Sequence, residues 1–310
     1  MLQRSGLLAM ERARTRSAFR IVTYHGVDER DHPVLNVDRL QTAPTLFAKQ
    51  IEALARQYQI VELETAVRSF LETGNWPERG LAITFDDGYR NNLEQAAPIL
   101  TRLGIPATFF VTASFVDGRS SPWWYALREW LTSRYPTSEQ AAAEALKLEA
   151  EWRPLSEKAR AQRFSELKAS GSVAPTFYPF MNREEVKQLS QMGFDIQPHG
   201  DAHLSFRGES LDRIQQDIEG SVRFVREVTG HDPWGFAYPY GHLPVPLELA
   251  QSLFETYGIL AAVSTREGNN EAQANRWALN RWDLHGGYSV PAVSARVAGI
   301  RRLRQDEAAP

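Results

Sequence analysis

The most distinctive segment of the chain reads Leu81-Ala82-Ile83-Thr84-Phe85-Asp86-Asp87-Gly88-Tyr89. An apolar and β-branched run, typical of a buried strand, leads directly into two adjacent carboxylates. Successive residues of a strand point to opposite faces, so a buried strand that ends in Asp86-Asp87 cannot hide both charges. Leaving them unpaired in the core costs several kcal/mol. A bound cation would offset that cost, and a plain Asp-Gly turn after the strand is the alternative.

Length and composition place the chain among ordinary soluble proteins. Its 310 residues fit one large domain or two small ones, and α/β barrels often reach this length as one unit. Hydrophobic residues make up 43% and charged residues 24% of the chain. The net charge of −3 gives no basic surface, so no nucleic-acid partner is expected. The chain has no cysteine, so any metal must be held by His, Asp or Glu.

The N-terminal residues do not have the pattern of a membrane span or a secretory signal. No apolar run approaches the ~20 residues that a membrane helix needs, so no transmembrane segment is expected. The apolar patch at residues 6–10 is short, and Glu11 and Arg12 interrupt it. These features predict a cytoplasmic protein in which residues 1–19 form an extension and residues 20–310 form one domain.

Short apolar strands alternate with amphipathic helices along the chain. Strands are predicted at residues 20–24, 81–85, 107–111, 194–197, 234–238 and 259–263. Apolar residues at steps of three and four predict helices at 45–58, 94–103 and 211–228, and Asn182 with Glu185 forms a capping box before a helix over 183–192. Strands separated by helices pair mostly in parallel, so we expect an α/β sheet or barrel.

Residues 123–170 interrupt this alternation. The stretch is polar and helix-rich, has no strand candidate, and opens with Trp123-Trp124-Tyr125. We interpret it as a helical insertion over one face of the barrel. Such an insertion must be fixed to the body of the protein, and buried indole rings do this well. The aromatic cluster is therefore interpreted as an anchor rather than as a platform for sugar.

A second strand is predicted to end in a pair of histidines, in Gly193-Phe194-Asp195-Ile196-Gln197-Pro198-His199-Gly200-Asp201-Ala202-His203. A spacing of four places His199 and His203 on one face of a helical turn, near enough to share a cation, although two unrelated surface histidines would look the same. This strand would run parallel to the Asp86-Asp87 strand, and α/β sites assemble where the carboxyl ends of parallel strands meet. Two His and one Asp make a three-ligand site with open positions, as in catalytic metal centres, and the other Asp is then free to act as a base.

A third strand leads into a turn in Trp234-Gly235-Phe236-Ala237-Tyr238-Pro239-Tyr240-Gly241-His242. An ordinary turn is one interpretation of this segment. Such a turn can also aim a backbone N–H at a developing oxyanion. Pro239 has no N–H, so Tyr240 is the candidate donor.

Together these motifs resemble the polysaccharide deacetylases of carbohydrate esterase family 4. The shared motifs are Thr84-Phe85-Asp86-Asp87-Gly88, His199-x-x-x-His203 and Phe236-Ala237-Tyr238-Pro239-Tyr240-Gly241, in this order, and the resemblance covers residues 20–282. The early Thr23-Tyr24-His25-Gly26-Val27 and the helical insertion resemble a bacterial subgroup associated with exopolysaccharide and surface-glycan synthesis. The resemblance implies an α/β fold, a distorted barrel of mainly parallel strands with helices.

The resemblance also implies a role for each motif residue. Asp86 would be the catalytic base, and the ligands of a divalent metal would be Asp87, His199 and His203. Zinc is the expected metal, although His and Asp suit Co²⁺, Ni²⁺ and Fe²⁺ as well. Tyr240 would supply the oxyanion N–H, and Tyr89 is a further candidate for substrate contact. The implied reaction hydrolyses the acetyl group of an N-acetylated carbohydrate.

The chain departs from the family pattern in two places. Many members have an arginine at the position of Ala237, where it braces the catalytic aspartate. Arg281 could reach in from the last strand instead, or it could be a solvated or purely structural arginine. Many members also place a general-acid histidine after a late Leu-x motif. Leu284-His285 matches this without the intervening residue, and His25 competes for the role, since an amide leaving group needs a proton.

We therefore predict a metal-dependent hydrolase that removes an acetyl group from an N-acetylated sugar of a glycan or of its lipid- or nucleotide-linked precursor. A second hypothesis is an amide hydrolase of the same fold that acts on a non-sugar acyl amide. A third is a catalytically inactive glycan-binding domain. The missing arginine at Ala237 favours this third hypothesis, and the complete set of Asp and His residues opposes it.

Overall fold

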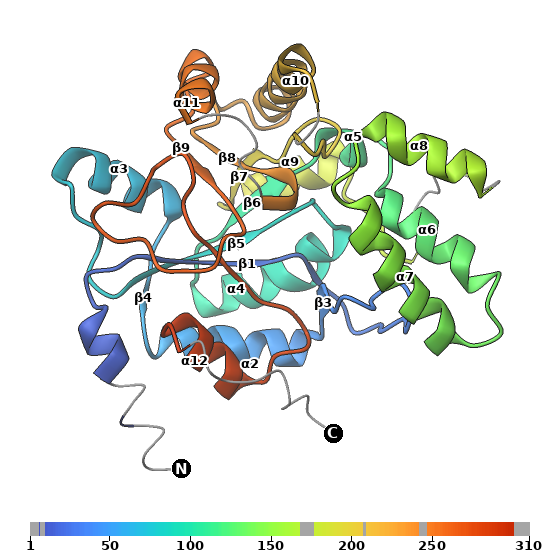
Figure 1. The fold of residues 1–310 in the computed structure, drawn as a ribbon. Coiled ribbons are helices and arrows are strands. Elements are labelled where there is room, and N and C mark those ends of the chain that lie inside the picture. Colours follow the sequence, from blue (N-terminus) through green and yellow to red (C-terminus); the bar gives the residue numbers. More distant parts are fainter. Residues whose placement is uncertain (1–5, 7–9, 168–176, 207–208, 242–246, 301–310) are drawn as a thin grey trace.

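In the computed structural model, the chain folds around a six-stranded parallel sheet (Figure 1). The structure describes residues 6, 10–167, 177–206, 209–241 and 247–300. The strand order is β10-β1-β5-β6-β7, and β4 also pairs with β5. These strands are β1 (Arg20–Tyr24), β4 (Gln59–Ile60), β5 (Gly80–Phe85), β6 (Thr108–Val111), β7 (Asp195–Pro198) and β10 (Trp282–Asp283). A short parallel pair, β2 (Gly26–Val27) with β3 (Gln41–Thr42), lies apart from this sheet.

The register of the sheet brings the carboxyl ends of its strands to one edge. β1 and β5 end side by side, with Tyr24 opposite Phe85. β7 ends at Pro198, next to the end of β6. His25, Asp86 and His199 directly follow β1, β5 and β7, respectively. The edge of the sheet that holds them is where parallel α/β proteins build their sites.

The sheet does not close into a complete barrel. β8 (Gly235–Ala237) and β9 (Ala261–Val263) form a separate parallel pair. In the described part of the chain β7 and β8 share no ladder. Instead the carboxamide oxygen of Gln197 accepts hydrogen bonds from the backbone N–H groups of Trp234 and Gly235, at 3.0 and 2.9 Å. The fold is thus the distorted barrel of mainly parallel strands that the sequence predicted.

Alternate strand residues pack in two layers. Val22, Ile83 and Phe109 belong to an outer apolar cluster with side chains of α2, α4, α9, α10 and α12. Ile21, Ala82 and Phe110 belong to an inner cluster with residues of β8 and β9. This alternation follows from the two-residue period of a strand. The helices of the body are α2 (Pro44–Ala55), α3 (Leu63–Thr73), α4 (Ala97–Leu103), α5 (Ala113–Val116), α9 (Arg183–Gln191), α10 (Leu211–Thr229), α11 (Leu247–Thr256) and α12 (Val290–Val297), with a π-helical turn η1 (Asn92–Ala96) and a 3₁₀ turn η2 (Pro239–Gly241).

Most predicted elements are present with small shifts at their ends. β1 has the predicted bounds, whereas β8 and β9 are shorter than predicted. The capping box of Asn182 and Glu185 is formed and opens α9. α10 is capped by Gly230, whose φ of 77° lies in the left-handed region that glycine adopts most easily. The two-residue strands β4 and β10 were not predicted, because two residues show no periodicity.

The predicted insertion forms three helices that lie together at one end of the molecule (Figure 1). They are α6 (Trp123–Thr132), α7 (Ser138–Trp152) and α8 (Glu157–Glu166), and residues 168–170 of the predicted range lie outside the described residues. Trp124 and Tyr125 are buried, as expected of an anchor. The fully buried Arg128 holds Glu149 of α7 through two hydrogen bonds of 2.6 and 2.8 Å, and it also bonds Asp38 at 2.5 Å. This buried ion network ties the insertion to the loop before β3.

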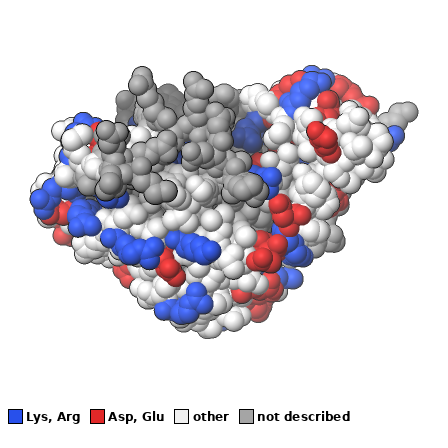
Figure 2. All heavy atoms as spheres, turned by 90° about the horizontal axis from the view of Figure 1, so that it is seen from below, with Lys and Arg blue, Asp and Glu red and all other residues white. Residues whose placement is uncertain are grey.

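The surface carries charges of both signs. On the face shown in Figure 2, Lys and Arg side chains are interspersed with Asp and Glu. Such mixing agrees with the small net charge of the sequence, −3. Of the helices that the structure describes, none combines the length and the hydropathy that a bilayer crossing requires.

Candidate active site

Asp86 and Asp87 both line one cavity of about 290 Å³ at the carboxyl edge of the sheet. Each is 2% exposed. Asp87 has a φ of 76°, in the left-handed region that aspartate tolerates better than most residues. The alternation of strand side chains therefore ends at Asp86, and the turn at Asp87 lets both carboxylates face the same space. The sequence argument had assumed that neighbouring carboxylates diverge, which holds only inside a strand.

His199 and His203 meet Asp87 in the same cavity. The Nε2 atoms of His199 and His203 lie 3.5 and 3.3 Å from Asp87 Oδ1. One ligand atom from each of the three residues lies within 4.8 Å of the others, and all three side chains are buried. His203 reaches this position with a φ of 51°. Backbone strain of this kind is characteristic of functional sites, where the surrounding structure holds it.

The donor atoms of this triad fit a divalent cation. Asp87 Oδ1 is buried and has no hydrogen-bond partner in the described structure, so its lone pairs are free for a ligand bond. The Nδ1 of His199 lies 2.8 Å from the carbonyl oxygen of Ala237, which fixes the ring and leaves Nε2 to face Asp87. Burial lowers the pKa of His203 and favours the neutral imidazole that binds metals. Two imidazoles and one carboxylate are a common donor set of catalytic zinc sites.

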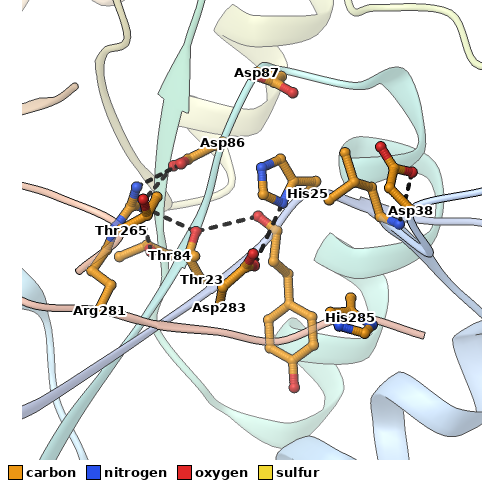
Figure 3. Close-up of polar contacts among 12 residues, drawn as sticks. Thr23, His25, Asp38, Thr84, Asp86, Asp87, Thr265, Arg281, Asp283 and His285 are labelled. Carbon is orange, nitrogen blue, oxygen red and sulfur yellow. Dashed lines mark hydrogen bonds and ion pairs between the residues drawn. The ribbon is translucent and has the colours of Figure 1, made fainter. Parts of the chain in front are cut away.

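Arg281 holds Asp86 from the end of the barrel (Figure 3). Its Nη1 and Nη2 donate to the two carboxylate oxygens of Asp86, at 2.8 and 2.6 Å. Nη1 also bonds the hydroxyl groups of Thr23 and Thr84, and Nε bonds the carbonyl of Ser264 at 2.8 Å. Arg281 is 0% exposed. The solvated arginine that the sequence left open is therefore excluded, and Arg281 makes a bidentate contact with the predicted base.

The electrostatics of the two aspartates follow from these contacts. Burial would raise the pKa of Asp86, but the charges of Arg281 and His199 outweigh it and hold that pKa below its usual value. Burial would likewise raise the pKa of Asp87, but the adjacent imidazoles of His199 and His203 hold it well below the usual value. Both carboxylates are therefore ionised at neutral pH.

Tyr240 stands beside the triad in a strained turn. Its φ is 60°, which is rare for a bulky residue. The Nε1 of Trp123 donates to the Tyr240 hydroxyl at 2.8 Å, and the ring of His203 lies 4.6 Å from the Tyr240 ring. At the next position a Cβ would come 1.8 Å from the Oγ1 of Thr265, so only glycine fits at Gly241. The turn is thus fixed on both sides.

Two candidate acids line the cavity as well. His25 Nδ1 lies 3.9 Å from Asp283 Oδ1, and neither atom has a hydrogen-bond partner within the described residues (Figure 3). His285 Nδ1 accepts a hydrogen bond from the Gly287 N–H at 3.0 Å. Burial raises the pKa of Asp283, and burial lowers the pKa of His285. The structure therefore brings both histidines to the cavity and gives them different surroundings.

Two of the sequence candidates, Arg281 and Tyr89, do not line the cavity, and Arg281 reaches it only through its contact with Asp86. Tyr89 is 0% exposed, its hydroxyl lies 3.1 Å from that of Tyr125, and its ring stacks on Phe180. Because Tyr89 points into this aromatic packing, we withdraw it as a substrate contact.

Several cavity residues were not identified from the sequence. These are Asp38, Leu40, Trp123, Trp124, Glu149, Arg153, Tyr238, Gly241, Thr265 and Asp283. Asp283 lies two residues after Arg281, and residues two apart in an extended segment point to the same face. This spacing was the one sequence signal that could have placed Asp283 near the site. Asp201, which had no assigned role, accepts hydrogen bonds from Arg119 at 3.2 and 2.6 Å and so fastens the loop between the two histidines.

Comparisons with known proteins agree with this geometry. The Bacillus subtilis (strain 168) protein YxkH, whose name assigns it to the polysaccharide deacetylases, is 19% identical over 224 residues. The match covers 72% of this chain and 58% of YxkH, so the chain spans less than two thirds of that relative. The fold resembles the Streptococcus pyogenes deacetylase PplD in complex with acetate, with a TM-score of 0.64, 17% identity, and coverage of 90% of this chain and 98% of that one. It also resembles IcaB from Ammonifex degensii, with a TM-score of 0.62, 19% identity, and coverage of 91% and 97%.

The two structural likenesses show the fold, and a sequence profile shows the family. The profile described as polysaccharide deacetylase matches residues 73–255, which is more than half of the chain. That range contains the aspartate pair, both histidines and the Tyr240 turn. The chain is therefore a member of the polysaccharide deacetylase family.

Proposed function

We propose that this protein is a metal-dependent deacetylase that hydrolyses the acetyl group of an N-acetylated sugar in a glycan or its precursor. The observation that carries the proposal is the juxtaposition, in one cavity, of a buried Asp-His-His triad with a second carboxylate that Arg281 keeps ionised. A module that only binds glycans needs neither feature. Membership of the deacetylase family supports the same reaction, and the exopolysaccharide and surface-glycan subgroup remains our proposal for the biological context.

The residues of the chain divide the reaction between them. Asp87, His199 and His203 would hold a divalent cation, with zinc as the proposed metal, and that cation would supply Lewis acidity to the acetyl carbonyl and to water. Asp86 takes the proton of the attacking water, and its ionised state suits that task. The backbone N–H of Tyr240 donates to the oxyanion that develops on the acetyl carbonyl.

We assign the general acid to His25. His25 directly follows β1, Asp86 directly follows the neighbouring strand β5, and both side chains line the cavity, which places His25 near the reacting centre. The charged groups around His285 are Asp283, Asp38, His25 and Arg39. Burial lowers the pKa of His285, which disfavours the protonated form that an acid must have. His25 would give a proton to the amine as it leaves.

Replacing His25 with glutamine is expected to reduce kcat by about 10²–10⁴-fold, the usual contribution of a positioned acid. His285→Gln is the matched comparison, because it removes the other histidine of the same cavity, and its kcat should fall by about tenfold or less. Acetate release at saturating substrate measures both. A larger loss in His285→Gln than in His25→Gln would transfer the role of acid to His285.

Removal of bound metal by a chelator is expected to abolish acetate release, and Zn²⁺ should restore it. His199→Gln should lose metal in the same way, whereas His231→Gln, an exposed histidine away from the cavity, should retain it. Metal content by mass spectrometry and acetate release across a panel of N-acetyl sugars and non-sugar acetamides are the measurements. Turnover of the non-sugar amides alone would support the second hypothesis, and metal binding without acetate release would support an inactive glycan-binding domain.

A further inference from the structure

The helical insertion supplies one wall of the catalytic cavity. Trp123 and Trp124 of α6, Glu149 of α7 and Arg153, which directly follows α7, all line it together with the metal triad. The insertion therefore contacts whatever the cavity binds. Because the metal triad and Asp86 come from the barrel and not from the insertion, this wall is suited to select a substrate rather than to perform the chemistry.

Among the charged side chains of this wall, the acids are already engaged and Arg153 is free. Glu149 and Asp38 are both bound by the buried Arg128, at 2.6 and 2.5 Å. Arg153 is exposed; its backbone N–H bonds the carbonyl of Glu149 at 2.9 Å, but within the described residues its guanidinium has no hydrogen bond or ion pair. A guanidinium without a carboxylate partner at the mouth of a cavity is available for an anion, which it can bind through two parallel hydrogen bonds.

Arg160 of α8 adds a second positive charge behind the same wall. Arg160 is 6% exposed, yet within the described residues the single hydrogen bond of its guanidinium is to the carbonyl of Leu155, at 2.6 Å, and the guanidinium has no acidic partner. Its guanidinium lies 5.4 Å from the ring centre of Trp123 and 6.0 Å from that of Tyr240. A buried cation without a counter-charge is costly, and an anion bound nearby reduces that cost.

The other acids of the cavity each lie beside an arginine or a histidine. Asp86 is paired with Arg281, and Asp87 faces two histidines. Asp283 lies beside His25. Among the described residues that line the cavity, Arg153 is the one arginine or lysine, and Arg128 and Arg160 lie behind it in the insertion.

We infer that Arg153 binds an anionic group, a phosphate or a carboxylate, carried by the N-acetylated sugar or by the linkage directly attached to it. This inference rests on the proposed function. The cavity of about 290 Å³ lies at the small end of ligand pockets, which range over roughly 300–1,000 Å³. A sugar that places its acetamide at the triad therefore has room for little more than its own substituents, so the anion lies on that sugar unit or next to it.

The test compares three probes on the metal-loaded full chain. They are methyl N-acetylglucosaminide, N-acetylglucosamine 1-phosphate and N-acetylmannosaminuronic acid, which are neutral, phosphate-bearing and carboxylate-bearing. We expect kcat/KM for at least one charged probe to exceed that for the neutral probe by about 10- to 100-fold. The charged probe with the higher value distinguishes a phosphate-linked precursor from a uronic acid.

Arg153→Gln should remove this preference, so that kcat/KM for the charged probes falls to the level of the neutral probe. Arg134→Gln is the matched control, because Arg134 is an exposed arginine of the same insertion that does not line the cavity. Equal kcat/KM for charged and neutral probes, or an unchanged preference in Arg153→Gln, would overturn the inference while acetate release still supported the proposed function.

Calorimetry of the charged probes tests the anion site at Arg153 independently of the deacetylase activity. Binding that is lost in Arg153→Gln but not in Arg134→Gln, without acetate release from any probe, would support the anion site and count against the deacetylase. If binding of the charged probes does not depend on Arg153 and no acetate is released, both proposals fail.

Discussion

Replacing Asp86 with asparagine is expected to reduce kcat by about 10²–10⁴-fold while the metal content stays at the wild-type level. Asparagine keeps the shape of the side chain but cannot accept the proton of the attacking water. Asp87→Asn should give the opposite pattern, with metal lost, because the buried Oδ1 of Asp87 is the oxygen that both histidines face. Acetate release and metal content, measured on the same preparations, test the pair.

The two variants control for each other, and Asp212→Asn controls for the handling of the protein, since Asp212 is an exposed residue of α10. Asp86→Asn also leaves Arg281 without its counter-charge, so the thermal midpoint must be recorded to confirm that the variant is folded. Loss of metal in Asp86→Asn together with retention in Asp87→Asn would exchange the roles of the two aspartates.

Truncation of Arg281 to alanine is expected to lower the free energy of unfolding by about 3–5 kcal/mol, because it leaves Asp86 as a buried charge without a partner. It should also lower kcat, because Asp86 loses the two hydrogen bonds that orient it. Denaturant unfolding and acetate release are the measurements. Arg281→Lys keeps the charge but not the bidentate geometry, so it should recover part of the stability and less of the activity.

Arg183→Ala is the matched control for Arg281→Ala. Arg183 also approaches a carboxylate to 2.6 Å, that of Asp117, but its side chain is 42% exposed. Solvent screens such a pair, so its loss should cost about 0–1 kcal/mol. An Arg281→Ala protein that is folded and fully active would show that Asp86 needs no brace.

The sequence predicted most of the fold because the strands are short, apolar and separated by clear helices. β1 was located to the residue, and the capping box before α9 needed only Asn182 and Glu185. β10 could not be found in the same way. Its pairing with β1 joins residues more than 250 positions apart, through Thr23 and Asp283, and such a contact leaves no local pattern.

The same distinction between local patterns and distant contacts holds for the residues of the site. Asp86, Asp87, His199 and His203 were readable because each ends a strand with an unusual polar motif. The sequence left the role of Arg281 open between a partner of Asp86 and a solvated or structural arginine, because nothing near Arg281 in the sequence indicates that it is buried. Arg153 was missed entirely. It lies in a polar helical segment, where an arginine is ordinary, and its significance depends on the Arg128 network that engages the neighbouring acids.

The carboxamide of Gln197 joins β7 to β8 where other barrel strands are joined by a ladder. Besides this side chain, the apolar residues of β8 and β9 that pack with Ile21, Ala82 and Phe110 hold the two parts of the barrel together. His199 follows β7, whereas Ala237 and Tyr240 lie in and after β8. The catalytic centre therefore spans a junction that has no ladder, and the position of the His199 ring depends on the carbonyl of Ala237 on the other side of it.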